Sequence, residues 1–378
     1  MSNSQIPGTA FADAKPHYHI LDGLRGVAAL SVVCFHVFEA FATSHLDQII
    51  NHGYLAVDFF FILSGFVVGY AYDDRWEKMT VLDFIKRRLI RLHPMVVLGA
   101  IIGGIMFYTQ GCSVWDVSKV SISMLLVATL INALLIPATP GFEIRGVGEM
   151  FPLNGPSWSL FFEYIGNLLY AFWLRKLSTK ALTVLVVLAA FGLAAFAMVG
   201  PYGDLCVGFS ITGDNMLGGS LRLLFSFAAG LLLSRVFKPI AVKGTFWIGS
   251  LAILVLSAIP RIGGSEYLWM NGLYDTLCVT IVFPALVYLG ASETTISQRM
   301  TRLCTFLGDL SYPLYMVHYP FIYLYFAWVK NEKLTFEQSL PGALALVVGS
   351  VILAYGCLKL YDERVRRYLT NRLLRVGK

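Results

Sequence analysis

The pair of residues best placed for chemistry lies in the first apolar run of the sequence. Arg25 and His36 have ten residues between them, and steps of about 100° per residue bring the two side chains onto one face of a helix. His36 then lies roughly 16 Å further along the helix axis. A neutral imidazole can take a proton from an attacking hydroxyl group. The spacing fits a catalytic His36 as well as a histidine that hydrogen-bonds a neighbouring helix.

Two carboxylic acids lie in strongly apolar stretches, where each needs a partner. Asp58 is followed by a run of phenylalanines, and it either orients His36 or neutralises an arginine in a structural ion pair. Glu163 follows Ser159 by four residues, so their side chains share a helix face. Because Glu163 has aromatic neighbours, we favour a functional role for it over a packing role.

Basic side chains and one further histidine mark two more candidate positions. Arg88 and Arg91 are three residues apart, so they share a helix face and suit the phosphates of a large anionic cofactor. The basic stretch that contains them also fits a simple anchor at a membrane surface. His318 lies between Pro313 and Pro320, which predicts a kinked helix. Its imidazole either lines the site or satisfies a backbone group near the kink.

The elements that must position these residues are apolar segments. Of the 378 residues, 57% are hydrophobic and 14% are charged, whereas roughly a quarter are charged in a soluble domain. The sequence predicts an all-α, polytopic bundle of transmembrane helices. The net charge of +6 does not indicate nucleic-acid binding, because the basic residues flank apolar segments, where they meet anionic headgroups. The eleven apolar segments lie near residues 24–43, 54–72, 93–110, 118–136, 157–174, 180–199, 220–237, 244–261, 271–290, 306–328 and 339–360.

The positions of the basic clusters predict the number of spans. If all eleven segments cross the membrane, the clusters at 86–91 and 175–180 fall on opposite sides. Omitting the segment 118–136, which polar residues interrupt, puts every cluster on one side. This predicts about ten spans with both termini cytoplasmic. The predicted parts are a cytoplasmic segment at 1–20, a transmembrane domain at 21–360 and a basic cytoplasmic tail at 361–378.

The N-terminus, the C-terminal region and the cysteines give no sign of a secreted, multidomain or metal-binding protein. The first twenty residues are polar and lack the apolar region of a secretory signal peptide. We expect no separate soluble domain after the last apolar segment. The six cysteines show no CxxC spacing, so we predict neither a disulfide framework nor a metal site.

Five motifs together resemble the acyltransferase-3 family of polytopic membrane acyltransferases. They agree with that family in order and spacing from about residue 20 to residue 325. The resemblance implies transfer of an acyl group, commonly acetyl, from cytoplasmic acyl-CoA to a hydroxyl group, often on a surface glycan. It also implies a ten-span core in the cell (inner) membrane. The motifs are Leu21–Gly26 with His36, Asp58–Gly65, Arg88 with Arg91, Ser159 with Glu163, and Leu310–Pro320.

Roles for single residues follow from the motifs and the resemblance together. The expected acceptor is a glycan or a lipid-linked sugar, the expected donor is acyl-CoA, and membrane lipids surround the chain. The alternative class is a transporter in which Asp58, Glu163 and His318 form a path for a substrate or a proton. The expected catalytic residues are His36, Arg25, Glu163 and Asp58, the expected ligands of the CoA phosphates are Arg88 and Arg91, and the residues expected to line the site are Ser159, His318 and Tyr312.

Overall fold

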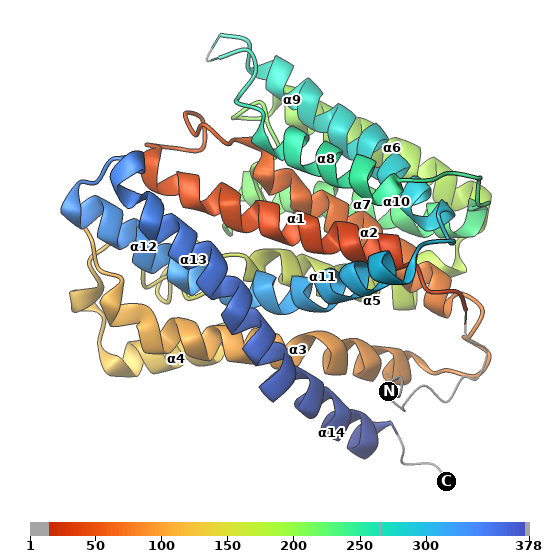
Figure 1. The fold of residues 1–378 in the computed structure, drawn as a ribbon, viewed down its shortest axis with the longest axis horizontal. Coiled ribbons are helices and arrows are strands. Elements are labelled where there is room, and N and C mark those ends of the chain that lie inside the picture. Colours follow the sequence, from red (N-terminus) through yellow and green to blue (C-terminus); the bar gives the residue numbers. More distant parts are fainter. Residues whose placement is uncertain (1–14, 265, 375–378) are drawn as a thin grey trace.

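The computed structural model describes residues 15–264 and 266–374. The described residues form helices and loops and contain no strand, in agreement with the predicted all-α bundle (Figure 1). Residues 1–14 lie outside the described part, and with them most of the predicted segment 1–20. The α-helices are α1 His19–Phe38, α2 Ala56–Tyr72, α3 Val81–Met106, α4 Ile122–Ala133, α5 Ser157–Phe172, α6 Thr179–Val199, α7 Gly213–Val236, α8 Thr245–Ala258, α9 Leu268–Leu277, α10 Phe283–Ser292, α11 Gln298–Val317, α12 Tyr319–Glu332, α13 Phe336–Cys357 and α14 Glu363–Leu373.

Several shorter helical turns join these helices. The π-helical segment Cys278–Val282 makes α9 and α10 one continuous helix, and Leu358–Asp362 does the same for α13 and α14. The short 3-10 helices among the described residues are Glu39–Phe41, His52–Leu55, Phe107–Thr109, Val117–Lys119 and Leu174–Lys176.

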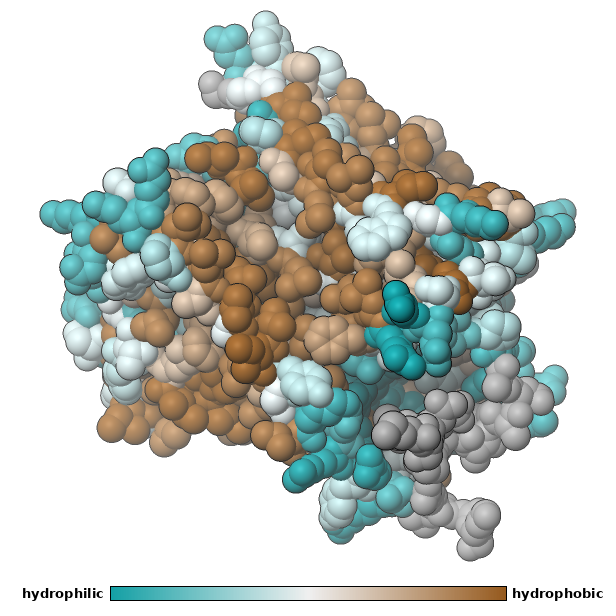
Figure 2. Space-filling model, viewed as in Figure 1, coloured by the Kyte–Doolittle hydropathy of each residue, from teal (hydrophilic) through white to brown (hydrophobic). Residues whose placement is uncertain are grey.

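Apolar helices long enough to cross a membrane make up much of the bundle. Figure 2 shows apolar surface across the middle of the molecule. The described residues contain seven helices with the length and composition of a span, and the number ten stays a prediction. Helix α4, which falls in the segment 118–136, has 12 residues and is about 18 Å long, too short to cross a core of about 30 Å. The seven are His19–Phe41, His52–Tyr72, Val81–Thr109, Thr179–Val199, Gly213–Val236, Leu268–Ser292 and Phe336–Leu373.

Side chains at the helix ends tie one end of the bundle together. Arg235, in the last turn of α7, donates to the Asp73 carboxylate after α2 at 2.7 Å and to the Leu177 carbonyl oxygen after α5 at 2.7 Å. Tyr288 of α10 donates to the Lys238 carbonyl oxygen at 2.6 Å. We call this end the basic end. Helix α14 lies on this side of the bundle, and α1, α3 and α11 begin here (Figure 1).

Glycines allow the two most extensive helix contacts, α2 with α7 and α1 with α11. A Cβ atom on Gly230 of α7 would lie 2.0 Å from the Ile62 carbonyl oxygen of α2. A Cβ atom on Gly26 of α1 would lie 2.5 Å from the Leu307 Cβ of α11. Small residues of this kind let helix backbones approach closely in membranes. Helix α1 is therefore held in the bundle with His36 toward the end opposite the basic end.

The helix kink predicted from the two prolines falls at His318. Helix α11 ends at Val317 and contains Pro313, whereas α12 begins at Tyr319 with Pro320 in its first turn. The predicted segment 306–328 is thus two helices, with His318 at the junction.

Candidate functional site

A cavity of about 340 Å³ lies at the end of the bundle opposite the basic end, which we call the cavity end. Residues 42–45, which follow α1, line it. Because Thr43 and Ser44 are exposed, the cavity opens at this end. Much of its wall is aromatic, as is usual for small-molecule sites, and several polar or charged side chains, Arg222 among them, also line it. The aromatic side chains include Trp115, Trp158, Phe209, Tyr319, Tyr323 and Phe326.

The histidine predicted to be catalytic lines this cavity together with a carboxylate. His36 Nδ1 lies 2.7 Å from Glu39 Oε1, and the side chains are 14% and 27% exposed. A carboxylate can only accept a hydrogen bond, so Nδ1 carries the proton and donates it. In the neutral tautomer that donates from Nδ1, the Nε2 atom of His36 carries the lone pair, and none of the described residues hydrogen-bonds Nε2. The geometry is that of a base oriented by an acid.

Glu39 was missed by the sequence analysis, although a signal for it was present. It follows His36 by three residues, which is one of the spacings at which helix side chains meet. It lies in the short 3-10 helix after α1, within the first apolar segment, 24–43. A phenol also reaches this carboxylate, because the Tyr319 hydroxyl lies 3.5 Å from Glu39 Oε2.

His318 lies next to His36, but its imidazole hydrogen-bonds to backbone carbonyl groups. The two rings are 5.5 Å apart between centroids. His318 Nδ1 lies 3.0 Å from both the Leu314 and the Tyr315 carbonyl oxygens, so it satisfies groups at the kink, one of the two predicted roles. Its Nε2 atom is buried and has no hydrogen-bond partner among the described residues.

Asp58 is held by an arginine and not by His36. Its carboxylate accepts from Arg222 Nη2 at 2.7 Å and from Nε at 3.2 Å, and both side chains are 0% exposed. Arg222 also donates to the carbonyl oxygens of Val207 at 2.7 Å and Tyr54 at 2.8 Å. Of the two roles predicted for Asp58, the structure shows the ion pair. Arg222 was missed, although a charged residue near the start of an apolar segment was a signal.

The two residues of the Ser-x3-Glu motif lie in separate contacts along α5. Ser159 Oγ lies 2.7 Å from the Tyr315 hydroxyl oxygen, and Tyr315 lines the cavity. Glu163, one turn closer to the basic end, accepts from Arg88 Nη2 at 2.8 Å and from the Ser64 hydroxyl at 2.9 Å. Arg88 is therefore occupied by a carboxylate.

Arg25 joins α1 to α11 near the basic end. Its Nε donates to Ser311 Oγ at 2.9 Å, and its Nη2 donates to the Gly308 carbonyl oxygen at 3.0 Å. The Asp22 carboxylate lies 3.1 Å from the same Nη2. Arg25 and His36 share α1, as predicted, and lie on opposite sides of its midpoint.

The remaining predicted residues, Arg91 and Tyr312, lie about one turn beyond Arg88 along α3, on the side away from the basic end. Arg91 is exposed, and it forms no hydrogen bond or ion pair within the described part of the chain. Tyr312 of α11 donates to the Leu92 carbonyl oxygen of α3. The structure therefore separates Arg88 and Arg91 by partner: the first is buried against Glu163 and the second faces outward.

A second carboxylic acid, not predicted from the sequence, lines the cavity from the segment between α4 and α5. Glu149 Oε2 accepts a hydrogen bond from the Tyr323 hydroxyl. Burial raises the pKa of Glu149 to about 7, and the nearby charge of Arg145 opposes this rise. Arg145 lies 3.5 Å above the Tyr323 ring and donates to Gln110 Oε1 at 2.8 Å. No pattern in the sequence distinguishes Glu149 from other loop acids.

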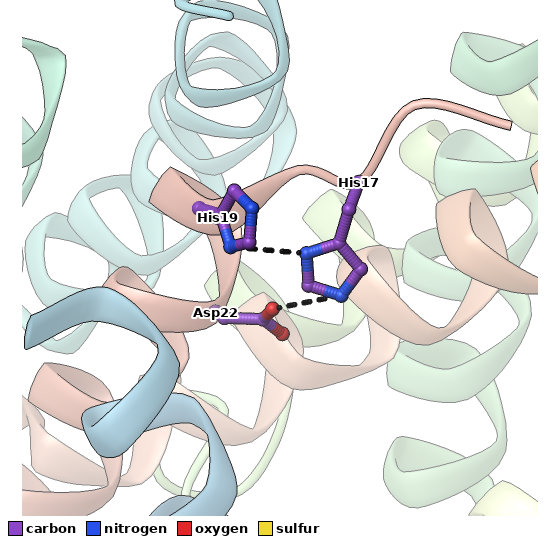
Figure 3. A group of neighbouring side chains, drawn as sticks. All are labelled: His17, His19 and Asp22. Carbon is purple, nitrogen blue, oxygen red and sulfur yellow. Dashed lines mark hydrogen bonds and ion pairs between the residues drawn. The ribbon is translucent and has the colours of Figure 1, made fainter. Parts of the chain in front are cut away.

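One group of possible metal ligands occurs among the described residues, at the start of α1 (Figure 3). His17 Nδ1 lies 3.2 Å from His19 Nδ1, and His17 Nε2 lies 3.3 Å from Asp22 Oδ2. Asp22 is also the partner of Arg25. Since these contacts occupy both nitrogens of His17, the group is explained as a hydrogen-bonded chain that ends at Arg25, and we assign it no ion.

Comparisons with known proteins agree with the resemblance found in the sequence. The family model described as acyltransferase domain matches residues 18–359. Acyltransferase MdmB of Streptomyces mycarofaciens is 25% identical over 366 residues, which cover 89% of this chain and 88% of that protein. Protein 2 in picA locus of Rhizobium radiobacter is 36% identical over 174 residues, 44% of this chain and 87% of that protein.

A third relative is longer than this chain. O-acetyltransferase OatA of Staphylococcus aureus is 24% identical over 321 residues, which cover 80% of this chain and 50% of that protein. No solved structure matches the chain.

Proposed function

This chain belongs to the acyltransferase domain family, and we propose that it transfers an acyl group from cytoplasmic acyl-CoA to a hydroxyl group of a glycan. The observation that carries the proposal is the His36–Glu39 pair beside the cavity. The cavity of about 340 Å³ is within the range of small-molecule sites. We propose that a sugar of the acceptor enters it from the cavity end and lies against the aromatic walls.

The proposed reaction uses the free nitrogen of His36 as a base. Nε2 accepts the proton of the acceptor hydroxyl group, whose oxygen forms a bond with the thioester carbonyl carbon. The bond between that carbon and the CoA sulfur breaks, and the proton on His36 passes to the sulfur, which leaves as a thiol. Glu39 keeps the Nδ1 proton in place and stabilises the charge on the imidazolium.

A two-step route uses the same residues. His36 Nε2 attacks the thioester, CoA leaves as the thiol, and the acyl group passes from His36 to the acceptor hydroxyl group in a second step. Incubation with labelled acetyl-CoA and no acceptor distinguishes the routes, because a labelled protein accumulates only in the two-step route.

The donor is proposed to approach from the basic end, where Arg91 is exposed and available to phosphates. Arg88 is held by Glu163, so in this proposal it positions α3 against α5. One relative is named an O-acetyltransferase, which supports acetyl as the acyl group. We place the protein in the cell (inner) membrane, with the basic end in the cytoplasm.

The test compares His36→Ala with the wild-type protein in a strain that lacks the chromosomal copy. Mass spectrometry of surface glycans should show one acyl mass with the wild type and none with His36→Ala at equal protein levels. His17→Ala, which changes an exposed histidine at the other end of α1, is the matched control and should keep the product. Normal acylation by a well-expressed His36→Ala protein would exclude this site.

A further inference from the structure

Helix α14 lies outside the part of the chain that the family model covers. That part ends at residue 359, and α14 begins at Glu363. The continuous helix Phe336–Leu373 has 38 residues, about 57 Å at 1.5 Å per residue. This is far more than a hydrocarbon core of about 30 Å, so α14 emerges at the basic end. There it packs against α3 (Figure 1).

The ion pair at the start of α14 is incomplete. Arg366 Nη2 lies 2.7 Å from Asp362 Oδ2, and the side chains are 26% and 1% exposed. Neither oxygen of Asp362 accepts a hydrogen bond from any described residue, and Arg366 Nε is buried without an acceptor. The guanidinium is therefore close to the carboxylate but not aligned with it. An anion that approaches from outside would find donors of Arg366 still unused.

A second arginine without a hydrogen-bonded partner among the described residues, Arg91 of α3, lies near the Asp362–Arg366 pair. Arg91 is exposed, and its charge acts on Asp362 as well as on Arg25. Arg366 and Asp362 also act electrostatically on Tyr312, whose hydroxyl group bonds to the Leu92 carbonyl oxygen. Parts of α3, α11 and α14 thus meet in one polar region at the basic end.

We propose that Arg91 of α3 and Arg366 of α14 together bind the phosphate groups of acyl-CoA, and that Asp362 holds Arg366 in place while the donor is absent. The inference rests on the proposed function. A phosphate carries more charge than a carboxylate and presents several oxygens to the guanidinium fork. Arg366 therefore turns from an imperfect pair with Asp362 to a better one with the donor. Arg88 cannot do this without leaving Glu163.

The test measures CoA binding by calorimetry to the full chain in nanodiscs of zwitterionic lipid. Arg366→Gln should weaken binding about tenfold, the cost of one charge-assisted contact of about 1.4 kcal/mol. Asp362→Asn removes the competing carboxylate and should bind CoA at least as tightly as the wild type. Arg364→Gln removes the same charge from an exposed position of α14 and should change nothing. If the pair were only structural, Arg366→Gln and Asp362→Asn would weaken binding alike, which would overturn the inference.

Dephospho-CoA, which lacks the 3′-phosphate, shows whether this phosphate is the one bound. The wild type should prefer CoA to dephospho-CoA, and Arg366→Gln should lose most of that preference. Equal CoA affinities for Arg366→Gln and Arg364→Gln overturn the inference and leave the proposed function intact. The inference is also overturned if both variants bind CoA normally and lose only binding to vesicles that contain phosphatidylglycerol. In that case α14 would bind lipid headgroups. A wild-type protein that binds no CoA contradicts the proposed function itself.

Discussion

The helix pairs α2–α7 and α1–α11 are packed in the same way but end differently. In both pairs, glycines bring the backbones together and an arginine bonds across the interface. In α2–α7, the donors of Arg222 meet the Asp58 carboxylate and two carbonyl oxygens. In α1–α11, the interface opens at the cavity end, where Nε2 of His36 and Nε2 of His318 have no partner among the described residues.

This difference in hydrogen bonding distinguishes the α2–α7 interface, as scaffold, from the open end of α1–α11, as the candidate site. Buried polar groups in proteins are nearly always hydrogen-bonded, and the Asp58–Arg222 pair of α2–α7 follows this rule. His36 lines the cavity, so its Nε2 atom is available to a ligand, whereas His318 is buried and does not line the cavity. From this comparison we propose that Asp58 belongs to the scaffold and His36 to the reaction, although both are ionisable residues in apolar segments.

The largest expected effect comes from breaking the α2–α7 ion pair. Asp58→Asn leaves the Arg222 charge buried without a counter-charge, which costs about 3–5 kcal/mol of folding free energy. The thermal midpoint of the purified protein should fall sharply, and the amount of protein in the membrane should fall with it. Asp214→Asn changes an exposed acid in the first turn of α7 and should leave the midpoint unchanged. A stable Asp58→Asn protein with lost activity would instead return Asp58 to the catalytic residues.

The next largest effect comes from a change at the cavity end of α1–α11. It should lower the rate of the reaction more than the stability of the protein. Glu39→Gln replaces the carboxylate that holds the His36 Nδ1 proton, and the rate constant kcat should fall about 100-fold. This corresponds to about 2.7 kcal/mol of barrier. The thermal midpoint should stay close to that of the wild type, because Glu39 is 27% exposed.

Its control is Glu77→Gln, an exposed acid after α2, which should keep the wild-type kcat. An unchanged kcat in Glu39→Gln would show that the carboxylate does not orient the base.

A smaller loss of stability is expected from adding one methyl group between close helices. Gly230→Ala in α2–α7 and Gly26→Ala in α1–α11 each force the backbones apart, at about 1–3 kcal/mol. Gly213→Ala, at the start of α7, meets nothing within 4 Å and is the matched control. Similar losses at Gly230 and Gly26 would show that the two interfaces are equally tight. A loss at Gly230 alone would mean that α1–α11 can relax toward its open end.

The sequence predicted the parts of this comparison that lie within one helix. Ten intervening residues were enough to place Arg25 and His36 on α1, because helix periodicity is local. Apolar segments predicted the bundle for the same reason, and the prolines around His318 predicted its kink.

Contacts between distant segments could not be predicted. Asp58 and Arg222 are 164 residues apart in the chain, and no periodicity links them. Whether Arg88 or Arg91 faces outward depends on the position of Glu163 in α5, which one sequence does not reveal. Glu149 becomes part of the cavity only because its loop folds against α12.

The smallest expected effect is on the pH dependence of stability, which the cavity residue Glu149 should influence. Burial raises the pKa of Glu149 from 4.5 to about 7, so the folded chain keeps a proton that the unfolded chain has already released between these values. Stability should therefore fall as the pH rises through this window and level off above about pH 7. Glu149→Gln removes the titrating group. Between pH 5 and pH 8, the fall in its thermal midpoint should therefore be about 2 °C smaller than the fall in the wild-type midpoint. Equal pH dependence in the two proteins would mean that the Glu149 carboxylate is already ionised in the folded cavity.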